Sequence, residues 1–156
     1  MLHLIVAMSK QGAIGLDGKL PWHHSGDLKH FKEVTWNQKV LMGRKTLAKL
    51  PRVLPNREIY CVTRQKDVSL PSGQEVTIIN DFEGFCQQHQ HSDDLFYIAG
   101  GASIYQVALP YVSEMIVSVI NYDQEADTFF PSFIQEGFRL SRREKKEDFE
   151  ILYYRR

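Results

Sequence analysis

Cysteine is scarce in this chain, since only Cys61 and Cys86 occur among its 156 residues. Cys61 falls in a strand-like run and Cys86 in a helix-like run, so no disulfide framework is indicated. The N-terminal segment MLHLIVAMSKQG also lacks the basic leader and the small-residue cleavage site of a signal peptide. We therefore expect reduced thiols and a cytoplasmic protein.

Long apolar runs and an excess of one charge are absent too. No apolar stretch approaches the roughly 18 residues that a membrane span requires, so we expect no contact with a membrane. The chain carries 19 Lys and Arg against 19 Asp and Glu, which gives a formal net charge of +0. The stretch RREKKED at 142–148 mixes both signs and is typical of a solvated face. A nucleic-acid partner is therefore not expected.

Several catalytic motifs are missing as well. The six histidines show no H-E-x-x-H or other strong zinc spacing, so we expect no metal. The histidines in HH at 23–24 and QHQH at 88–91 are predicted to be exposed. The chain has no G-x-S-x-G elbow, no P-loop and no G-x-G-x-x-G fingerprint. These absences exclude the commonest hydrolase and nucleotide-binding signatures.

The chain does contain short apolar runs that alternate with helix-like stretches. Strands are predicted at 2–8, 39–43, 58–63, 75–79, 95–99, 114–120 and 149–155. Helices are predicted at 25–35, about 44–50, about 82–90 and about 103–109. Several strands are apolar on both faces, as in a sheet that is covered on both sides. We therefore predict one α/β domain over residues 1–156, with a mostly parallel sheet and an antiparallel C-terminal hairpin at its edge.

The first predicted helix carries an acid within its apolar face. Ser25 is a candidate N-cap, which would start the helix near residue 26. At about 100° per residue, Asp27 falls on the face that also holds the residues Leu28, Phe31 and Val34. His30 lies at the edge of the opposite, polar side. Acids are favoured in a first helical turn, but a carboxylate among apolar groups also marks many functional sites, so both interpretations stay open at this point.

The segment 9–22 is a long connection after the first strand. It contains three glycines, yet it also contains the large apolar residues Ile14, Leu16, Leu20 and Trp22. A loop that is merely solvated has little use for such side chains. We therefore predict a functional lid.

Three predicted strand ends are suited to bind anions. They carry the segments Gly43–Thr46, Thr63–Gln65 and Gly100–Ser103, of which the first and third open a helix. Helix N-termini offer free N–H groups, and glycine lets a phosphate approach closely. Three such ends at one edge of a sheet indicate a ligand with several phosphates, such as a dinucleotide. Arg44, Lys45 and Arg64 would suit an extra 2′-phosphate and so favour NADP over NAD.

The motifs AIGLDGKLPW, DLKHFKEVT, VLMGRKT, LPNRE, YIAGGASIY and ADTFFP resemble, in order and spacing, those of chromosomal-type bacterial dihydrofolate reductases. The resemblance covers essentially the whole chain. It implies an eight-stranded, mostly parallel sheet with four flanking helices. It also implies that NADPH delivers a hydride to C6 of dihydrofolate while a proton reaches N5, and that antifolate inhibitors bind to a monomeric enzyme.

The resemblance further implies roles for individual residues. Asp27 matches the acid of the pterin pocket, with Ser118 where the family usually has Thr, and Leu20 and Trp22 complete the implied catalytic group. The implied substrate-binding residues are Ile5, Ala7, Asp27, Leu28, Phe31, Lys32, Leu50, Arg52, Leu54, Arg57, Ala99 and Ser118. Arg57 matches the arginine that holds the glutamate α-carboxylate of the substrate.

The cofactor-binding residues that the resemblance implies surround the lid and the three strand ends. They are Ala7, Ile14, Gly15, Gly18, Leu20, Gly43, Arg44, Lys45, Thr46, Val62, Thr63, Arg64, Gln65, Ala99, Gly100, Gly101, Ala102, Ser103, Ile104 and Tyr105. Gly100–Gly101 matches a cis peptide bond of the family.

Two other hypotheses remain open. A reductase of the same fold could act on another heterocycle, such as the pyrimidine of riboflavin synthesis, but such a substrate lacks the glutamate tail that Arg57 would hold. A non-catalytic dinucleotide-binding module would keep Arg44, Arg64 and the Gly100–Gly101 pair without needing Asp27 on an apolar face.

Overall fold

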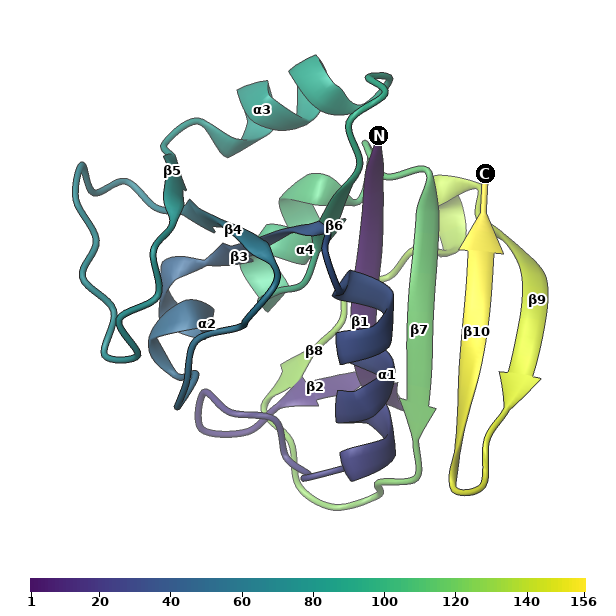
Figure 1. Cartoon of the computed structure of the whole chain (residues 1–156). Helices are drawn as coiled ribbons and strands as arrows, with labels where there is room; N and C mark the ends of the chain where they lie inside the picture. The colour runs from purple at the N-terminus through teal and green to yellow at the C-terminus, as the bar shows by residue number, and fades with distance from the viewer.

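The computed structural model describes residues 1–156, and eight of its strands form one sheet (Figure 1). The strand order is β5-β4-β3-β6-β1-β7-β10-β9. In chain order these strands are β1 (Leu2–Ser9), β3 (Lys39–Gly43), β4 (Glu58–Val62), β5 (Thr77–Ile79), β6 (Phe96–Ile98), β7 (Glu114–Ile120), β9 (Arg139–Lys145) and β10 (Phe149–Arg155). Neighbours from β5 to β7 run parallel, whereas β10 pairs antiparallel with β7 and with β9. The predicted fold class, including the C-terminal hairpin, is confirmed.

Four helices flank the sheet, as the resemblance implies. They are α1 (Ser25–Thr35), α2 (Arg44–Ala48), α3 (Phe82–His89) and α4 (Ala102–Ala108). The bounds differ from those predicted by a residue or two, because helix and strand ends depend on hydrogen bonds that apolar patterning does not report. None of these helices is long and apolar enough to cross a membrane.

Three strands were not located by their sequence pattern. β9 is almost entirely exposed, so it has no buried face to produce an alternating pattern. The other two, β2 (Ala13–Gly15) and β8 (Thr128–Phe129), form a separate two-stranded sheet and are too short for a period to show. β2 lies inside the predicted lid, so that segment is partly ordered by a strand pair. A short 3₁₀ turn, η1 (Ile134–Glu136), precedes β9.

The helices cover opposite faces of the sheet. The largest core cluster joins the strands to α3 and α4 through Phe82, Cys86, Tyr105 and Ala108. On the other face, α2 contributes the buried Leu47, and α1, which crosses in front of β1 in Figure 1, packs its apolar residues over β1, β7 and β10. Strands enclosed in this way are apolar on both faces, which explains the continuous runs in the sequence.

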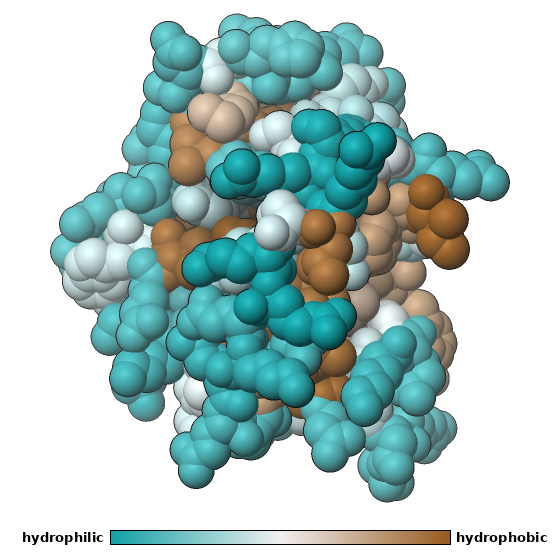
Figure 2. All heavy atoms as spheres, turned by 90° about the vertical axis from the view of Figure 1, so that its right-hand side faces the viewer, coloured by the Kyte–Doolittle hydropathy of each residue, from teal (hydrophilic) through white to brown (hydrophobic).

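The exposed edge of the sheet is charged. β9 presents a row of arginines and lysines to solvent. The Nε atom of Arg143 lies 3.0 Å from a carboxylate oxygen of Glu150 in β10. Figure 2, which faces this side of the molecule, shows a largely hydrophilic surface with apolar groups between. Charged residues on an edge strand discourage pairing with another chain. The solvated face predicted for 142–148 is confirmed, since only Glu144 in that stretch is even partly buried.

Leu41 offers a direct test of the core. It is fully buried in β3, between β4 and β6. Leu41→Ala is expected to lower the free energy of unfolding by about 2–5 kcal/mol, because it leaves a cavity in a packed interior. Val53→Ala, at a site that is 45% exposed, is the control and should change it by less than about 0.5 kcal/mol. Urea denaturation measures both, and equal effects of the two substitutions would contradict the assigned core.

Candidate active site

Helix α1 is capped by His24 rather than by Ser25. The helix begins at Ser25, and the Nδ1 atom of His24 accepts a hydrogen bond of 3.0 Å from the backbone N–H of Asp27. The predicted Ser25 cap is therefore wrong. Ser25 has the common capping side chain, but the residue before it takes the extended backbone conformation that a cap requires.

Asp27 is buried in the first turn of α1. Its side chain and backbone together are only 8% exposed. Burial raises the pKa of the Asp27 carboxyl above its ordinary value of 3.8, while the Ser118 hydroxyl and the nearby His30 and His24 act in the opposite direction. The carboxyl therefore lies in a site where its charged form is poorly solvated. The N-terminus of a helix explains why an acid is favoured in this first turn. It does not explain why the side chain of that acid is buried.

Two neighbouring strands lie beneath Asp27. Ala7 of β1 and Ser118 of β7 are direct partners in the parallel register, and Ser118 is almost completely buried. Two residues earlier on β1, the carbonyl of Ile5 accepts a hydrogen bond of 2.9 Å from the hydroxyl of Tyr105. Burial raises the pKa of the Tyr105 hydroxyl, which therefore remains a donor. Strand pairing thus brings together residues that are more than 100 positions apart.

Apolar side chains line the region between α1 and α2. Phe31 packs against the cluster under α1 and also against the cluster under α2, and Ala99 does the same. Leu50 and Leu54 pack on the α2 side. Leu28 is 47% exposed and belongs to none of these clusters. The helical period predicted that Leu28 belongs to the apolar face of α1, but the side chain lies on the outer side of the helix.

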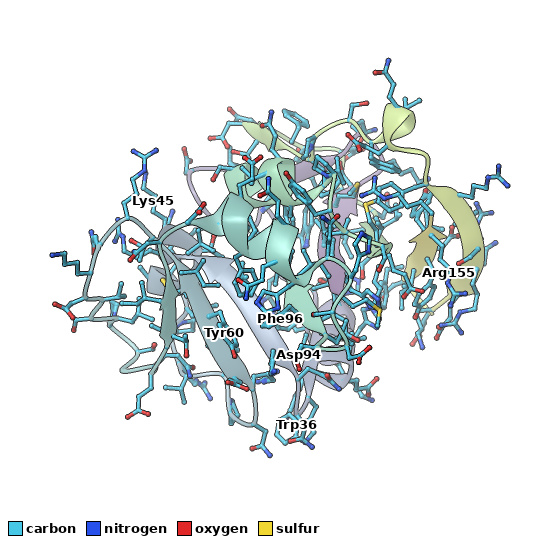
Figure 3. The ribbon with its side chains drawn as sticks, turned by 90° about the horizontal axis from the view of Figure 1, so that it is seen from above. Trp36, Lys45, Tyr60, Asp94, Phe96 and Arg155 are labelled. Carbon is cyan, nitrogen blue, oxygen red and sulfur yellow. The ribbon has the colours of Figure 1, made fainter.

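A cationic group lies at the C-terminal end of α1. The Nη1 atom of Arg57 donates a hydrogen bond of 3.2 Å to the Thr35 hydroxyl. The guanidinium of Arg57 and the ammonium of Lys32 lie 5.4 and 5.3 Å from the centre of the Trp36 ring, which is labelled in Figure 3. The Nε atom of Arg57 is buried without a protein partner. Arg52 is exposed in the loop that precedes Arg57.

The strand ends that were predicted to bind anions do lie side by side. β3 is the neighbour of both β4 and β6, so the segments after these three strands leave the same edge of the sheet. The backbone N–H of Gly43 donates to the carbonyl of Gly100 at 2.9 Å. The Gly100–Gly101 peptide bond is cis, as the resemblance implies. The first and third segments are therefore joined directly.

Glycine leaves room at two of these positions, where α2 and α4 approach closely. A Cβ atom on Gly101 would lie 3.1 Å from the Thr46 hydroxyl, and a Cβ atom on Gly43 would lie 3.2 Å from Ile104. Neither helix has a side-chain cap, so the N–H groups of their first turns remain free. Around this pair of helix ends lie the predicted residues Arg44, Lys45, Ala102 and Ser103.

The turn after β4 is fixed by a residue that the sequence did not point to. The side-chain amide of Asn80 donates to the carbonyls of Thr63 and Gln65, at 2.7 and 2.9 Å. The Thr63 hydroxyl also accepts from the backbone N–H of Gln65. Val62 and Thr63 are half-buried, and Arg64 projects into solvent from this pinned turn. Asn80 follows β5, and only the pairing of β4 with β5 reveals its proximity.

The predicted lid is tied down at several points. The Lys49 ammonium donates to the carbonyl of Gly18 at 2.6 Å, and the N–H of Asp17 donates to a carboxylate oxygen of Asp127 at 3.0 Å. Trp22 packs on Tyr122, with ring centres 5.3 Å apart, and its Nε1 atom is buried without a protein partner. At the start of the lid, Ile14 and Gly15 lie in β2, whereas Leu20 is 48% exposed.

Three of the histidines differ from their prediction. In the QHQH segment, His91 is exposed as predicted, but His89 is half-buried and its Nδ1 atom is buried. His30 is only 8% exposed, and the side chain of His24 is only 14% exposed. Both rings pack on Phe149. The distance between ring centres is 4.9 Å for His24 and 6.4 Å for His30. The expectation that the HH pair is exposed holds for His23 but is wrong for His24. The helical period also assigned His30 to the polar side, because it could not anticipate that β10 packs there.

The residues present fit a dinucleotide rather than a metal. No group of three or more His, Cys, Asp or Glu side chains is arranged to hold a metal ion. Two closely packed helix N-termini with free N–H groups, together with Arg44 and Arg64 at adjacent strand ends, instead suit a ligand with several phosphates. The buried, unpartnered nitrogens of Trp22 and Arg57 are donors that a second ligand could use.

Comparison with known proteins identifies the family of the chain. Residues 1–155 match the family described as "Dihydrofolate reductase". The dihydrofolate reductase of Mycoplasma genitalium is 36% identical over 100% of this chain and 98% of its own, and that of Bacillus subtilis is 32% identical over 99% and 94%. A solved dihydrofolate reductase from Enterococcus faecalis, in complex with NADP(H) and RAB-propyl, superposes with a TM-score of 0.83 at 28% identity and covers 99% of this chain and 95% of its own. The chain belongs to the dihydrofolate reductase family.

Proposed function

We propose that Asp27 is the anchor of a site in which this chain reduces 7,8-dihydrofolate to 5,6,7,8-tetrahydrofolate with NADPH. The observation that carries the proposal is the buried carboxyl of Asp27 beside Ser118, at the first turn of α1. The family assignment supports the reaction, and the geometry supports the roles of individual residues.

Asp27 orients the pterin ring. A carboxylate accepts two parallel hydrogen bonds, and N3–H with the 2-amino group of a pterin presents the matching pair of donors. The raised pKa of Asp27 lets the carboxyl hold a proton closer to neutral pH than an exposed aspartate can. Asp27 thereby assists protonation of N5 through water. Ser118, one strand over, stabilises the charged form of the carboxyl.

NADPH, when bound, supplies the hydride that reaches C6 of the substrate. The free N–H groups at the starts of α2 and α4 hold its phosphates, and Arg44, Thr63 and Arg64 contact the 2′-phosphate end. Tyr105, Ala7 and the lid residues Ile14, Gly15 and Leu20 enclose the nicotinamide end. Closure of the lid excludes water from the reacting atoms.

The apolar wall and the cationic group bind the rest of the substrate. Phe31, Leu50 and Leu54, with Leu28 at the outer side, contact the aromatic rings. Arg57 binds the glutamate α-carboxylate, since a guanidinium fits a carboxylate with two hydrogen bonds. Lys32 and Arg52 lie further out along the same tail.

The proposal extends to the state of the protein. We expect a single domain over residues 1–156 that acts as a monomer in the cytoplasm, where NADPH is abundant and thiols such as the free, buried Cys61 and Cys86 stay reduced. Dihydrofolate, NADPH and antifolate inhibitors are its expected partners, with no nucleic acid.

The first test is the loss of NADPH absorbance with dihydrofolate. The wild type is expected to turn over, and Asp27→Asn should lower turnover at neutral pH by about 10²–10⁴-fold, because it removes the proton source. The dissociation constant of NADPH should change by less than about twofold. Asp93→Asn, an exposed acid on the turn after α3, is the control. Near-normal turnover of Asp27→Asn would remove Asp27 from its role, and an inactive wild type that still binds NADPH would indicate another heterocycle.

The same carboxyl predicts a pH-dependent stability. Because the pKa of Asp27 is raised in the folded state, its ionisation destabilises that state above the folded pKa and has no effect below its ordinary value of 3.8. Asp27→Asn is therefore expected to unfold at higher urea concentration than the wild type at pH 7, by a margin that shrinks as the pH falls. An Asn variant that is equally or less stable at pH 7 would show that the carboxyl is not desolvated.

Arg64 tests the preference between cofactors. Arg64→Ala should weaken NADPH binding by about tenfold or more and leave NADH binding within about twofold, because only NADPH carries the 2′-phosphate. Fluorescence titration measures both constants. Lys66→Ala, two residues further along the exposed turn, is the control. Equal losses for both cofactors would place Arg64 away from the 2′-phosphate.

A further inference from the structure

His24 uses both of its ring nitrogens, one toward the catalytic helix and one toward the C-terminal hairpin. Nδ1 accepts from the N–H of Asp27 at 3.0 Å, and Nε2 lies 3.3 Å from a carboxylate oxygen of Asp148, in the turn between β9 and β10. A neutral imidazole carries a proton on only one nitrogen, so the cap at Nδ1 requires the tautomer with its proton on Nε2. Nε2 is near the Asp148 carboxylate but is not aligned for a hydrogen bond with it. The negative charge of Asp148 near Nε2 favours the form of His24 that can cap α1.

The His24 ring packs closely against Phe149 and against the first turn of α1. Phe149 lies edge-on to His24, with ring centres 4.9 Å apart. A Cβ atom on Gly26 would lie 3.1 Å from the Phe149 ring and 3.2 Å from the His24 ring. Glycine at position 26 therefore lets both rings close on the first turn of α1. The short segment from His24 to Asp27 is held against β10 by contacts that leave little free space.

The hairpin that holds His24 is also in register with the strand that bears Ser118. Phe149 pairs with Ile120, and Ile151 pairs directly with Ser118 across the β7–β10 ladder. One rigid element therefore fixes both groups beside the Asp27 carboxyl, Ser118 through strand pairing and His24 through Asp148 and Phe149. A Ser or Asn cap would satisfy the same N–H, but such a short side chain could not also reach the hairpin.

We propose that His24 is a positioning residue. By joining the N-terminus of α1 to the β9–β10 hairpin, it fixes the position of the Asp27 carboxyl relative to Ser118. The role rests on the proposed function of Asp27. His24 acts through the backbone of Asp27 and does not contact the substrate.

Two substitutions at position 24 separate positioning from simple stability. His24→Leu keeps apolar bulk but removes the acceptor, whereas His24→Asn keeps an acceptor for the cap. His24→Leu is expected to accelerate hydrogen exchange at the Asp27 amide at least tenfold. It should also raise KM for dihydrofolate at least fivefold while leaving the dissociation constant of NADPH within twofold. His24→Asn should restore most of the exchange protection but not the KM, because its short side chain caps α1 without reaching the hairpin. His23→Leu, at the exposed neighbour, should change neither.

A merely structural cap would lower Tm and the active fraction without moving KM. That result for His24→Leu, or an unchanged exchange rate at the Asp27 amide, would overturn the proposal. A wild type that fails to reduce dihydrofolate would instead contradict the proposed function, and the exchange rates of the same variants would still decide whether His24 holds Asp27.

The tautomer provides a spectroscopic test that does not depend on activity. In ¹⁵N-labelled wild type, the chemical shifts of His24 should show Nδ1 without a proton and Nε2 with one. Asp148→Ala and Asp148→Asn, which both remove the charge, should move proton occupancy toward Nδ1 and raise KM for dihydrofolate at least twofold, whereas Asp148→Glu, which retains the charge, should not. A protonated Nδ1 in the neutral ring of the wild type would exclude His24 as the cap.

Discussion

Three residues hold the two halves of the sheet together. β6 spans only Phe96–Ile98, yet it pairs with β1 on one side and with β3 on the other. Its first residue, Phe96, packs edge-on against Tyr60 and Phe85, at 5.3 and 4.9 Å, and Tyr60 and Phe96 are seen together near the centre of Figure 3. Without this strand, β5-β4-β3 and β1-β7-β10-β9 would have no common backbone ladder.

The pairing continues beyond the strand and fixes the segments that surround the candidate active site. The N–H of Ala99 donates to the carbonyl of Leu41, and the N–H of Gly43 donates to the carbonyl of Gly100, both at 2.9 Å. The starts of α2 and α4 are thereby fixed on one side of β6. On the other side, Ile5 and Ala7 of β1 form the surface beneath Asp27. The two parts of the candidate active site therefore meet at the junction that holds the sheet together.

Several polar groups of the candidate active site are buried, and their burial opposes folding. The Asp27 carboxyl is buried, and nitrogens of Trp22, His30 and Arg57 are buried without protein partners. Buried polar groups of this kind usually reduce stability. The surrounding core of fully buried Leu, Ile and Val side chains offsets that cost. Functional sites are the places where such a conflict between stability and chemistry is expected.

Much of this arrangement could be predicted from the sequence, because it depends on local patterns. Apolar runs located the strands of the enclosed sheet, and glycines before helices marked the strand ends at Gly43 and Gly100. Asp27 stood out because an acid interrupts an apolar stripe. The roles assigned to individual residues, by contrast, came from the resemblance to a family and stay predictions.

The remaining features could not be predicted because they depend on contacts between distant segments. Nothing in the residues near His24 shows that Asp148 and Phe149 pack against it, so the local sequence favours Ser25 as the cap. Asn80 becomes important only when β5 pairs with β4. β9 carries no buried face, and therefore its pattern resembles that of a polar loop. Each miss reflects tertiary context prevailing over local propensity.

The central claim is that the Asp27 carboxyl binds the 2-amino side of the pterin ring. The most direct measurement is a cycle of dissociation constants for a folate analogue and its counterpart without the 2-amino group, on wild type and on Asp27→Asn. The account predicts that deleting the amino group weakens binding to the wild type at least tenfold, or about 1.4 kcal/mol, and has little effect on the Asn variant. Equal losses on both proteins would show that the amino group and Asp27 do not interact, and would contradict the account.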